Sequence, residues 1–355
     1  MEGQNFLAAS GRSFTGLEKG DLNPEDVVEY SFVQMADPQL GMMSQMKEAQ
    51  KLLYLRTLIK IGSLGFKDGK KEIPVPVLDS LHSGQTSEEL FQLEVELSKM
   101  AVNAINAMEP KPVFAVVCGD LVHAFPNKDP EKNKMQVEAF KDVFSQVDSS
   151  IKLVCLCGNH DVGEAPSKTE LDLWKERFGD DYFSFWVGKD KYVVLNSQMY
   201  KNNRNCPEEA KEQDIWLTKE LSDLNEDCRH AIAFSHIPPF IQNPDEASGY
   251  FPLERDVRLD LLERLLGAGV SHWFCGHYHR NSVGTFDKDG KTLEVVVTGA
   301  VGGNIQTDPE GDPLGLTGMK TIAAHKQYSG LRVVRVTPEG LFHDFQSFEQ
   351  LGLGS

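Results

Sequence analysis

The sequence predicts an α/β protein in which two β-sheets pack together in one domain and carry helices on their outer faces. Between residues 30 and 275, short apolar runs typical of buried strands alternate with longer amphipathic segments typical of helices. After residue 284, the strand-like runs follow one another without helices between them. This order indicates two packed sheets flanked by helices, and 355 residues are enough to bury such a core.

The chain divides into a lead-in, a domain and a tail. Residues 1–29 are polar and glycine-rich, which predicts an irregular or partly disordered N-terminal segment. The predicted domain spans residues 30–346, and residues 347–355 form a C-terminal tail. Within the domain, residues 62–85 combine glycines, prolines and lysines, which is typical of an inserted loop.

The elements of the domain follow from apolar spacing. Apolar residues at helical spacing predict helices over 42–61, 86–108, 131–147, 168–178, 208–224 and 254–267. Short apolar runs predict buried strands over 30–36, 113–118, 151–157, 230–235 and 270–275. Residues 181–188 and 191–196 read as a hairpin, and the final strands are expected at 284–286, 293–298, 331–336 and 341–345.

Charge and hydropathy exclude several functional classes. The net charge is −17, so nucleic acid is not an expected partner, because its phosphates would be repelled. No apolar run approaches the ~18 residues of a membrane span, and the N-terminus lacks the pattern of a secretory signal. The six cysteines lie mostly in apolar strand patterns, which favours buried reduced thiols in a cytoplasmic protein over a disulfide framework.

Polar side chains follow the predicted buried strands at the point where each strand ends. Because rigid sheets aim such residues into a common site, we expect these side chains to converge. They are carboxylates, imidazoles and amides, a mixture suited to first-row divalent metals such as Mn, Fe or Zn. The set is Asp37, Gln39, Asp120, Asn159, His160, His236, His277 and His279.

These motifs, in this order, resemble those of the calcineurin-like metallophosphoesterases: Asp37-x-Gln39, Gly119-Asp120, Gly158-Asn159-His160-Asp161, His236 and Gly276-His277-Tyr-His279. The resemblance implies an αββα sandwich that holds two divalent cations (Mn, Fe, Zn or Mg). It implies that Asp120 bridges the two cations. It further implies that Asp37, Gln39 and His279 complete the first cation site, and that Asn159, His236 and His277 complete the second.

The resemblance also implies a reaction, the hydrolysis of phosphate monoesters by attack of a metal-activated water. His160 would lie near the leaving-group oxygen, and Asp161 would hold its imidazole and keep it cationic. Three connecting stretches, at 179–188, 195–198 and 276–281, are similar to those of a family member that dephosphorylates protein serine and threonine. A phosphorylated protein is therefore the expected substrate.

Two departures from the family pattern bear on function. The family usually has histidine where this chain has Gln39, which predicts a weaker first cation site that tolerates Mn²⁺ or Mg²⁺. The large protein phosphatases of the family carry an arginine shortly after the bridging aspartate, and residues 121–124 contain none. Arg280 and Arg204 are the candidates to replace that arginine, and His123 is a candidate for the rim of the cavity.

Two other functions remain open from the sequence. The first is a phosphodiesterase acting on a nucleotide or a lipid headgroup, which the missing arginine favours. The second is a scaffold that binds a metal or a partner without turnover, which Gln39 favours and the otherwise complete motif set disfavours.

Overall fold

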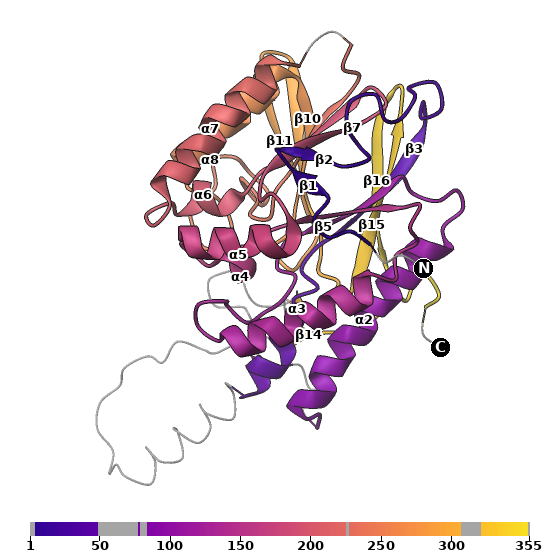
Figure 1. The fold of residues 1–355 in the computed structure, drawn as a ribbon, viewed down its shortest axis with the longest axis vertical. Coiled ribbons are helices and arrows are strands. Elements are labelled where there is room, and N and C mark those ends of the chain that lie inside the picture. The colour runs from indigo at the N-terminus through magenta and orange to yellow at the C-terminus, as the bar shows by residue number, and fades with distance from the viewer. Residues whose placement is uncertain (1–3, 49–76, 79–83, 225–226, 307–320, 354–355) are drawn as a thin grey trace.

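Two mixed β-sheets pack face to face, and helices cover the outer face of each sheet, as the sequence predicts (Figure 1). The computed structural model describes residues 4–48, 77–78, 84–224, 227–306 and 321–353. In this part of the chain, no helix combines the length and apolar character that crossing a bilayer requires.

The first sheet has five strands in the order β16-β15-β3-β5-β6. Its strands are β3 (Tyr30–Met35), β5 (Phe114–Cys118), β6 (Lys152–Leu156), β15 (Gly330–Thr337) and β16 (Gly340–Ser347). Strands β3, β5 and β6 run parallel, so their carboxyl ends meet at one edge. The helices on this side are α2 (Ser87–Ala107), α3 (Pro130–Phe144) and α5 (Lys168–Phe178), whose apolar faces pack on the sheet.

The second sheet has eight strands in the order β1-β2-β7-β8-β9-β10-β12-β11. Its strands are β1 (Ala9–Ser10), β2 (Ser13–Phe14), β7 (Phe183–Val187), β8 (Asp190–Val194), β9 (Ala231–Phe234), β10 (Val270–Cys275), β11 (Ser282–Lys288) and β12 (Lys291–Val297). Strands β8, β9, β10 and β12 are parallel. Helices α7 (Pro207–Ser222) and α8 (Arg255–Ala268) cover the outer face.

Aromatic side chains fill the layer between the two sheets. Phe32 of β3 stacks on Phe114 of β5, with ring centroids 4.7 Å apart, and both side chains are fully buried. Phe234 and Phe274 of the second sheet meet Phe32 edge-on. Such aromatic pairs stabilise a core beyond their area burial, so the strands of both sheets that lead to the site form one rigid platform.

The N-terminal segment is more ordered than the sequence suggested. Strands β1 and β2 lie within residues 4–29 and extend the second sheet, because Phe14 and Leu17 are buried against it. Two-residue strands carry no periodic signal, so nothing in the sequence predicts them.

Two other predicted segments fall largely outside the described residues. The helix expected over 42–61 is helical at residues 42–48, and the remainder of it is not described. Of the expected loop over 62–85, residues 77–78 form a short strand, β4 (Val77–Leu78). It pairs with β14 (Thr321–Ala323), which in turn pairs with β13 (Asn304–Gln306).

Candidate metal centre

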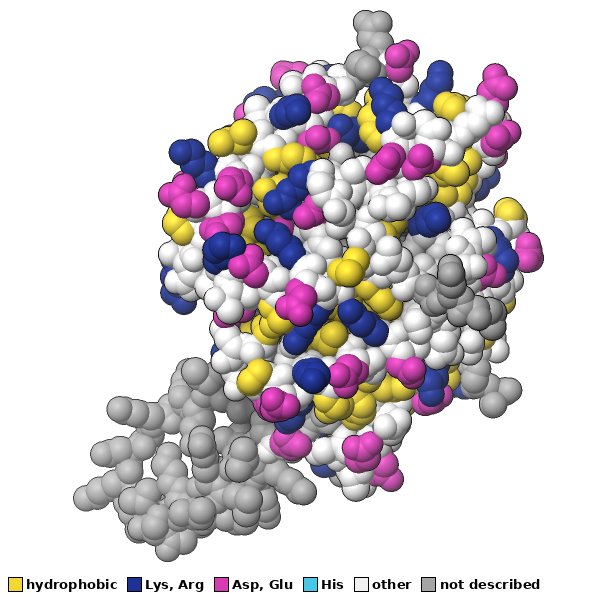
Figure 2. All heavy atoms as spheres, viewed as in Figure 1, with side chains coloured by type: hydrophobic (Ala, Val, Ile, Leu, Met, Phe, Trp, Pro, Cys, Tyr) yellow, Lys and Arg dark blue, Asp and Glu magenta, His cyan; other side chains and the backbone are white. Residues whose placement is uncertain are grey.

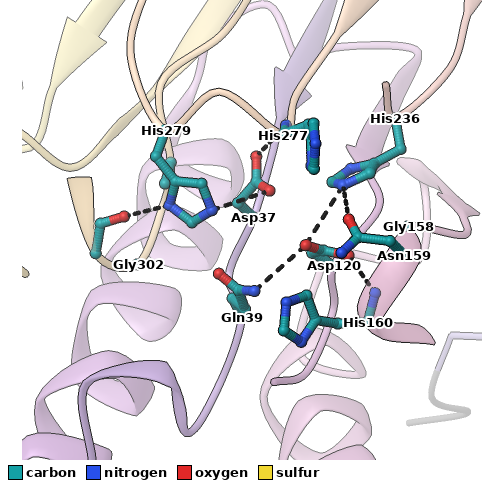
Figure 3. Close-up of polar contacts among 12 residues, drawn as sticks. Asp37, Gln39, Asp120, Gly158, Asn159, His160, His236, His277, His279 and Gly302 are labelled. Carbon is teal, nitrogen blue, oxygen red and sulfur yellow. Dashed lines mark hydrogen bonds and ion pairs between the residues drawn. The ribbon is translucent and has the colours of Figure 1, made fainter. Parts of the chain in front are cut away.

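The predicted ligands come together at the carboxyl ends of five parallel strands drawn from both sheets (Figure 3). The loop after β3 carries Asp37 and Gln39, and the loop after β5 carries Asp120. Asn159 begins the short helix α4 (Asn159–Val162) after β6. His236 follows β9, and His277 and His279 follow β10. The chain therefore brings residues from 37 to 279 to one edge of the sandwich.

Two clusters of ligand atoms share one carboxylate. One consists of Asp37, Asp120 and His279, the other of Asp120, His236 and His277. Within each cluster, the ligand atoms lie within 4.8 Å of one another. Asp120, only 1% exposed, therefore stands between the two groups and is placed to touch two cations at once.

Gln39 and Asn159 add an amide to each cluster. The Nε2 of Gln39 lies 3.3 Å from Asp120 Oδ2, and Asn159 Oδ1 lies 3.1 Å from His236 Nε2. Asn159 thus lies beside His236 of the second cluster, whereas Gln39 contacts the carboxylate that both clusters share. The seven candidate ligands are all buried.

The ligands adopt an unusual backbone conformation. Among the described residues, seven that are not glycine have positive φ, and five of them are candidate ligands. Those five are Asp37 (49°), Gln39 (39°), Asp120 (49°), His277 (68°) and His279 (53°). Non-glycine residues in this region are strained, and such strain concentrates where structure serves function.

At two positions, the absence of a glycine side chain leaves room for the carboxylates of the site. A Cβ on Gly158 would collide with Asp120 Oδ1 and with the Asp120 main-chain nitrogen. A Cβ on Gly276 would lie 2.7 Å from Asp37 Oδ2, closer than real Cβ contacts come. The Gly-Asn-His and Gly-His motifs therefore require glycine for steric reasons.

Hydrogen bonds fix which nitrogen of two histidines faces the centre. His236 Nδ1 lies 2.8 Å from the carbonyl oxygen of Cys118, and His279 Nδ1 lies 2.6 Å from that of Gly303. A carbonyl only accepts, so each Nδ1 carries the proton and each Nε2 carries a lone pair. These Nε2 atoms point at carboxylates, at 3.4 Å from Asp120 Oδ2 and 3.4 Å from Asp37 Oδ1 respectively.

Lone pairs that face one another require a positive charge between them, and a proton or a metal cation supplies it. Burial raises the pKa of Asp37 to about 6, although His279 and His236 oppose the rise. Burial lowers the pKa of His236, but the Asp120 and Asp37 carboxylates and the Cys118 carbonyl oxygen together outweigh burial and raise it to about 10. Without metal, His236 therefore carries a second proton, on Nε2, at neutral pH.

The residues fit a pair of divalent cations. Asp37 Oδ1 and Gln39 Oε1 are buried oxygens without a hydrogen-bond donor. Buried acceptors are nearly always satisfied, so these two oxygens are positioned for a ligand that accepts their lone pairs. Oxygen and imidazole donors together suit first-row divalent metals.

His160 lies beside Asp120 but takes no part in either cluster (Figure 3). Its main-chain N–H donates to Asp120 Oδ1 at 2.8 Å, and its ring Nδ1 lies 2.5 Å from the carbonyl oxygen of His123. The ring also stacks on the rings of His123 and Phe125, with centroids 4.5 and 4.3 Å away. His123 therefore contacts His160 directly.

The expected contact between Asp161 and the His160 imidazole is wrong. The Asp161 carboxylate instead accepts hydrogen bonds from the main-chain N–H groups of Gly158 (2.8 Å) and Leu121 (3.1 Å). It therefore ties the loop after β5 to the loop after β6. His160 is not held cationic either, because burial lowers its pKa, and the nearby Asp120 carboxylate only partly opposes this.

The two candidate arginines differ in their surroundings. Arg280 is partly buried, its guanidinium lies over the Tyr278 ring, and its Nε is a buried donor without a partner. Arg204 is exposed, in the segment between α6 (Ser197–Lys201) and α7. Arg280 thus has a buried donor without a partner and adjoins the candidate ligand His279 in the chain.

Two residues that the sequence did not single out contact the second cluster. Glu164 Oε1 accepts a hydrogen bond from Asn159 Nδ2 at 2.9 Å, and the Tyr250 hydroxyl lies 3.4 Å from both atoms. Both residues lie in loops without hydrophobic periodicity, so no signal in the sequence marks them.

Comparison with known proteins agrees with this geometry. A model of the calcineurin-like phosphoesterase family matches residues 89–281, more than half of the chain. The chain belongs to this family. The match contains Asp120, Asn159 and the three histidine ligands, whereas Asp37 and Gln39 precede it.

Other calcineurin-like phosphoesterases resemble the chain over most of its length. The serine/threonine-protein phosphatase CPPED1 of Danio rerio is 36% identical over 98% of this chain and 93% of its own. The protein of the same name from Homo sapiens is 41% identical over 74% of this chain and 76% of its own. The solved structure of the purple acid phosphatase PPD1 from yellow lupin has a TM-score of 0.55. It covers 90% of this chain and 52% of its own, at 12% identity, which supports the fold alone.

Proposed function

We propose that the chain hydrolyses phosphate monoesters on serine and threonine side chains of proteins, with two divalent cations at the metal centre. The observation that carries this proposal is the buried carboxylate of Asp120, shared by two ligand clusters whose lone pairs face inward. When bound, two such cations activate a water molecule, orient the phosphoryl group and stabilise charge on the attacking and leaving oxygens.

The ligands divide into two sets in this proposal. Asp37, Gln39 and His279 would hold the first cation, and Asn159, His236 and His277 the second, with Asp120 contacting both. Manganese, iron, zinc and magnesium all remain candidates. The amide of Gln39 is a harder and weaker donor than imidazole, so the first site is the one expected to accept Mn²⁺ or Mg²⁺.

His160 is the candidate acid for the leaving group. Its Nδ1–H donates to the His123 carbonyl oxygen, so a proton taken up by the ring resides on Nε2. From Nε2, it would pass to the serine or threonine oxygen that leaves phosphorus. Asp161 holds the loop that carries His160 rather than the ring itself.

The substrate is inferred from the relatives and from the site. The relatives of highest coverage are named serine/threonine-protein phosphatases, which supports a phosphoprotein substrate. Arg280, with its unpartnered Nε beside His279, is the candidate phosphate contact, ahead of the exposed Arg204. His123 is a candidate contact at the rim.

Charge and cysteine chemistry support the expected setting. The chain carries a net charge of −17, and on the face in Figure 2 lysine and arginine side chains are interspersed with acidic ones. Nucleic acid is therefore not a proposed partner. All six cysteines are free and five are buried, which supports the reducing environment of the cytoplasm.

The test is hydrolysis by metal-stripped protein to which Mn²⁺ is returned. The substrates are an aryl phosphate, its bis-aryl counterpart, and phosphoserine and phosphothreonine peptides. Monoester and phosphopeptide turnover that a chelator abolishes supports the proposal. Preferred diester turnover would favour a phosphodiesterase acting on a nucleotide or lipid headgroup. Two bound Mn²⁺ ions without any turnover would indicate a scaffold.

A further inference from the structure

The two halves of the metal centre differ in what holds their ligands in place. In the first half, main-chain groups hold two of the ligands: the Gly303 carbonyl oxygen holds His279, and the His277 N–H donates to Asp37 Oδ2 at 3.0 Å, whereas Gln39 contacts the shared Asp120 carboxylate. In the second half, a main-chain carbonyl holds His236, but side chains hold Asn159. The orientation of Asn159 in the second half therefore depends on which side chains surround it, and not on main-chain groups.

Asn159 needs such support because its carboxamide has two ends of nearly equal shape. Only Oδ1 binds a cation, whereas Nδ2 would repel one. Nothing in the shape of the side chain chooses between these ends, so the hydrogen-bond partner must choose. Glu164 makes the choice, since a carboxylate accepts only and therefore selects Nδ2. Oδ1 is then left facing His236 at 3.1 Å.

Tyr250 completes this support from a second loop. Its hydroxyl lies 3.4 Å from Asn159 Nδ2 and from Glu164 Oε1. Its carbonyl oxygen lies 3.4 Å from His277 Nε2, and its ring lies against the His277 ring with centroids 4.9 Å apart. A proton on Nε2 of His277 leaves the lone pair on Nδ1. Tyr250 thus touches two ligands of the same half.

We propose that Glu164 and Tyr250 are positioning residues that set the affinity of the second cation site. Glu164 orients the Asn159 amide by accepting its hydrogen bond. Tyr250, from a second loop, contacts both that amide and His277. Both residues are exposed, Tyr250 at 55%. The occupancy of one half of a buried centre is therefore controlled from the protein surface. The inference rests on the proposed function only in requiring two cations.

The experiment is a Mn²⁺ titration of the metal-stripped full chain by calorimetry, with electron paramagnetic resonance to follow the spin-coupled Mn²⁺ pair. Glu164→Leu removes the acceptor and is expected to weaken one of the two binding steps 10–100-fold. Glu164→Gln keeps an acceptor, but its amide also donates and no longer selects Asn159 Nδ2 alone, so we expect a loss between the wild type and Glu164→Leu. Gln39→Leu identifies the other step, because Gln39 belongs to the first half.

A double-mutant cycle separates orientation from other effects. In an Asn159→Asp background both ends of the side chain are oxygens, so orientation no longer matters. There, Glu164→Leu also removes a carboxylate beside another carboxylate. It should therefore leave the affinity unchanged or increase it. Tyr250→Phe should weaken the same step as Glu164→Leu, by a smaller factor.

Three results would overturn the proposal. They are a Glu164→Leu variant with both steps unchanged, a Glu164→Gln variant weaker than Glu164→Leu, or an equal loss in the Asn159→Asp background. The titration does not measure turnover. A protein that shows the expected binding but hydrolyses no phosphopeptide would therefore refute the proposed function and leave this inference intact.

Discussion

Replacing His160 by phenylalanine should separate proton transfer from metal binding. The phenyl ring retains the stacking on His123 and Phe125, and the main-chain N–H still donates to Asp120 Oδ1. Because the His160 ring belongs to neither ligand cluster, both cations should bind as in the wild type. The change then removes the proton on Nε2, together with the hydrogen bond from Nδ1 to the His123 carbonyl oxygen.

The expected loss depends on the leaving group. Proton transfer by a positioned side chain contributes about 10²–10⁴-fold in rate, which is roughly 2.7–5.5 kcal/mol at ~1.36 kcal/mol per decade. A serine alkoxide needs that proton, so phosphoserine peptides should lose the full factor. An electron-poor phenolate leaves without a proton, so its phosphate should lose less than about tenfold.

The assay measures kcat for a series of alkyl and aryl phosphates, with Mn²⁺ stoichiometry measured in parallel. His160→Gln checks that ring volume is not responsible. Burial lowers the pKa of His160, so the protonated form of the wild type declines as pH rises from the acid side of neutrality. That decline in alkyl-phosphate turnover should disappear in the variants. An equal loss for all leaving groups, or a lost cation, would refute the assignment.

Four further outcomes are expected. Asp120→Asn should abolish hydrolysis, and elemental analysis should show fewer than two bound Mn²⁺ ions, because a neutral amide does not offset the repulsion between the cations. Unchanged turnover would contradict the proposed site. Gly158→Ala should lose Mn²⁺ binding, since its Cβ meets Asp120, whereas Gly267→Ala, with no heavy atom within 4 Å, should raise unfolding stability by roughly 0.5–1 kcal/mol. Gln39→His should retain more metal through purification, and two tightly held ions in the wild type would refute the weak first site. Finally, His236 has its pKa raised to about 10 and must deprotonate to bind a cation. Metal uptake at pH 7 should therefore release at least one proton in a pH-stat, and affinity should rise with pH.

The sequence predicted the ligands because their chemistry and their position coincide. Asp120 follows five buried apolar residues of β5, and His236 follows the four of β9. A polar residue after such a run has to leave the sheet at its carboxyl edge. The same reasoning placed Asn159 and His277, and no knowledge of the loops was needed.

The contacts of each ligand could not be predicted in this way. Asp161 adjoins His160 in the chain, which suggested a contact between their side chains, yet main-chain N–H groups take up its carboxylate. Main-chain N–H groups lose their sheet partners where a strand ends and can then bind a carboxylate. The order of side chains in the sequence does not show where these free N–H groups will lie. Glu164 and Tyr250 were missed because partners 5 and 91 residues from Asn159 have no fixed spacing.

Backbone strain explains why the candidate ligands lie in loops close to the ends of core strands rather than on long surface loops. Five ligands have positive φ, and such residues cost of order 1–3 kcal/mol each. Their sum is comparable to the ~5–15 kcal/mol net stability of a typical domain, so flexible loops would relax and scatter the ligands. Here each strained residue lies two or four residues after the end of a strand, and Phe32 and Phe114 pack the strands together. Bound cations would offset part of the strain, which predicts that removing metal lowers the unfolding temperature. An equal unfolding temperature with and without Mn²⁺ would contradict this account.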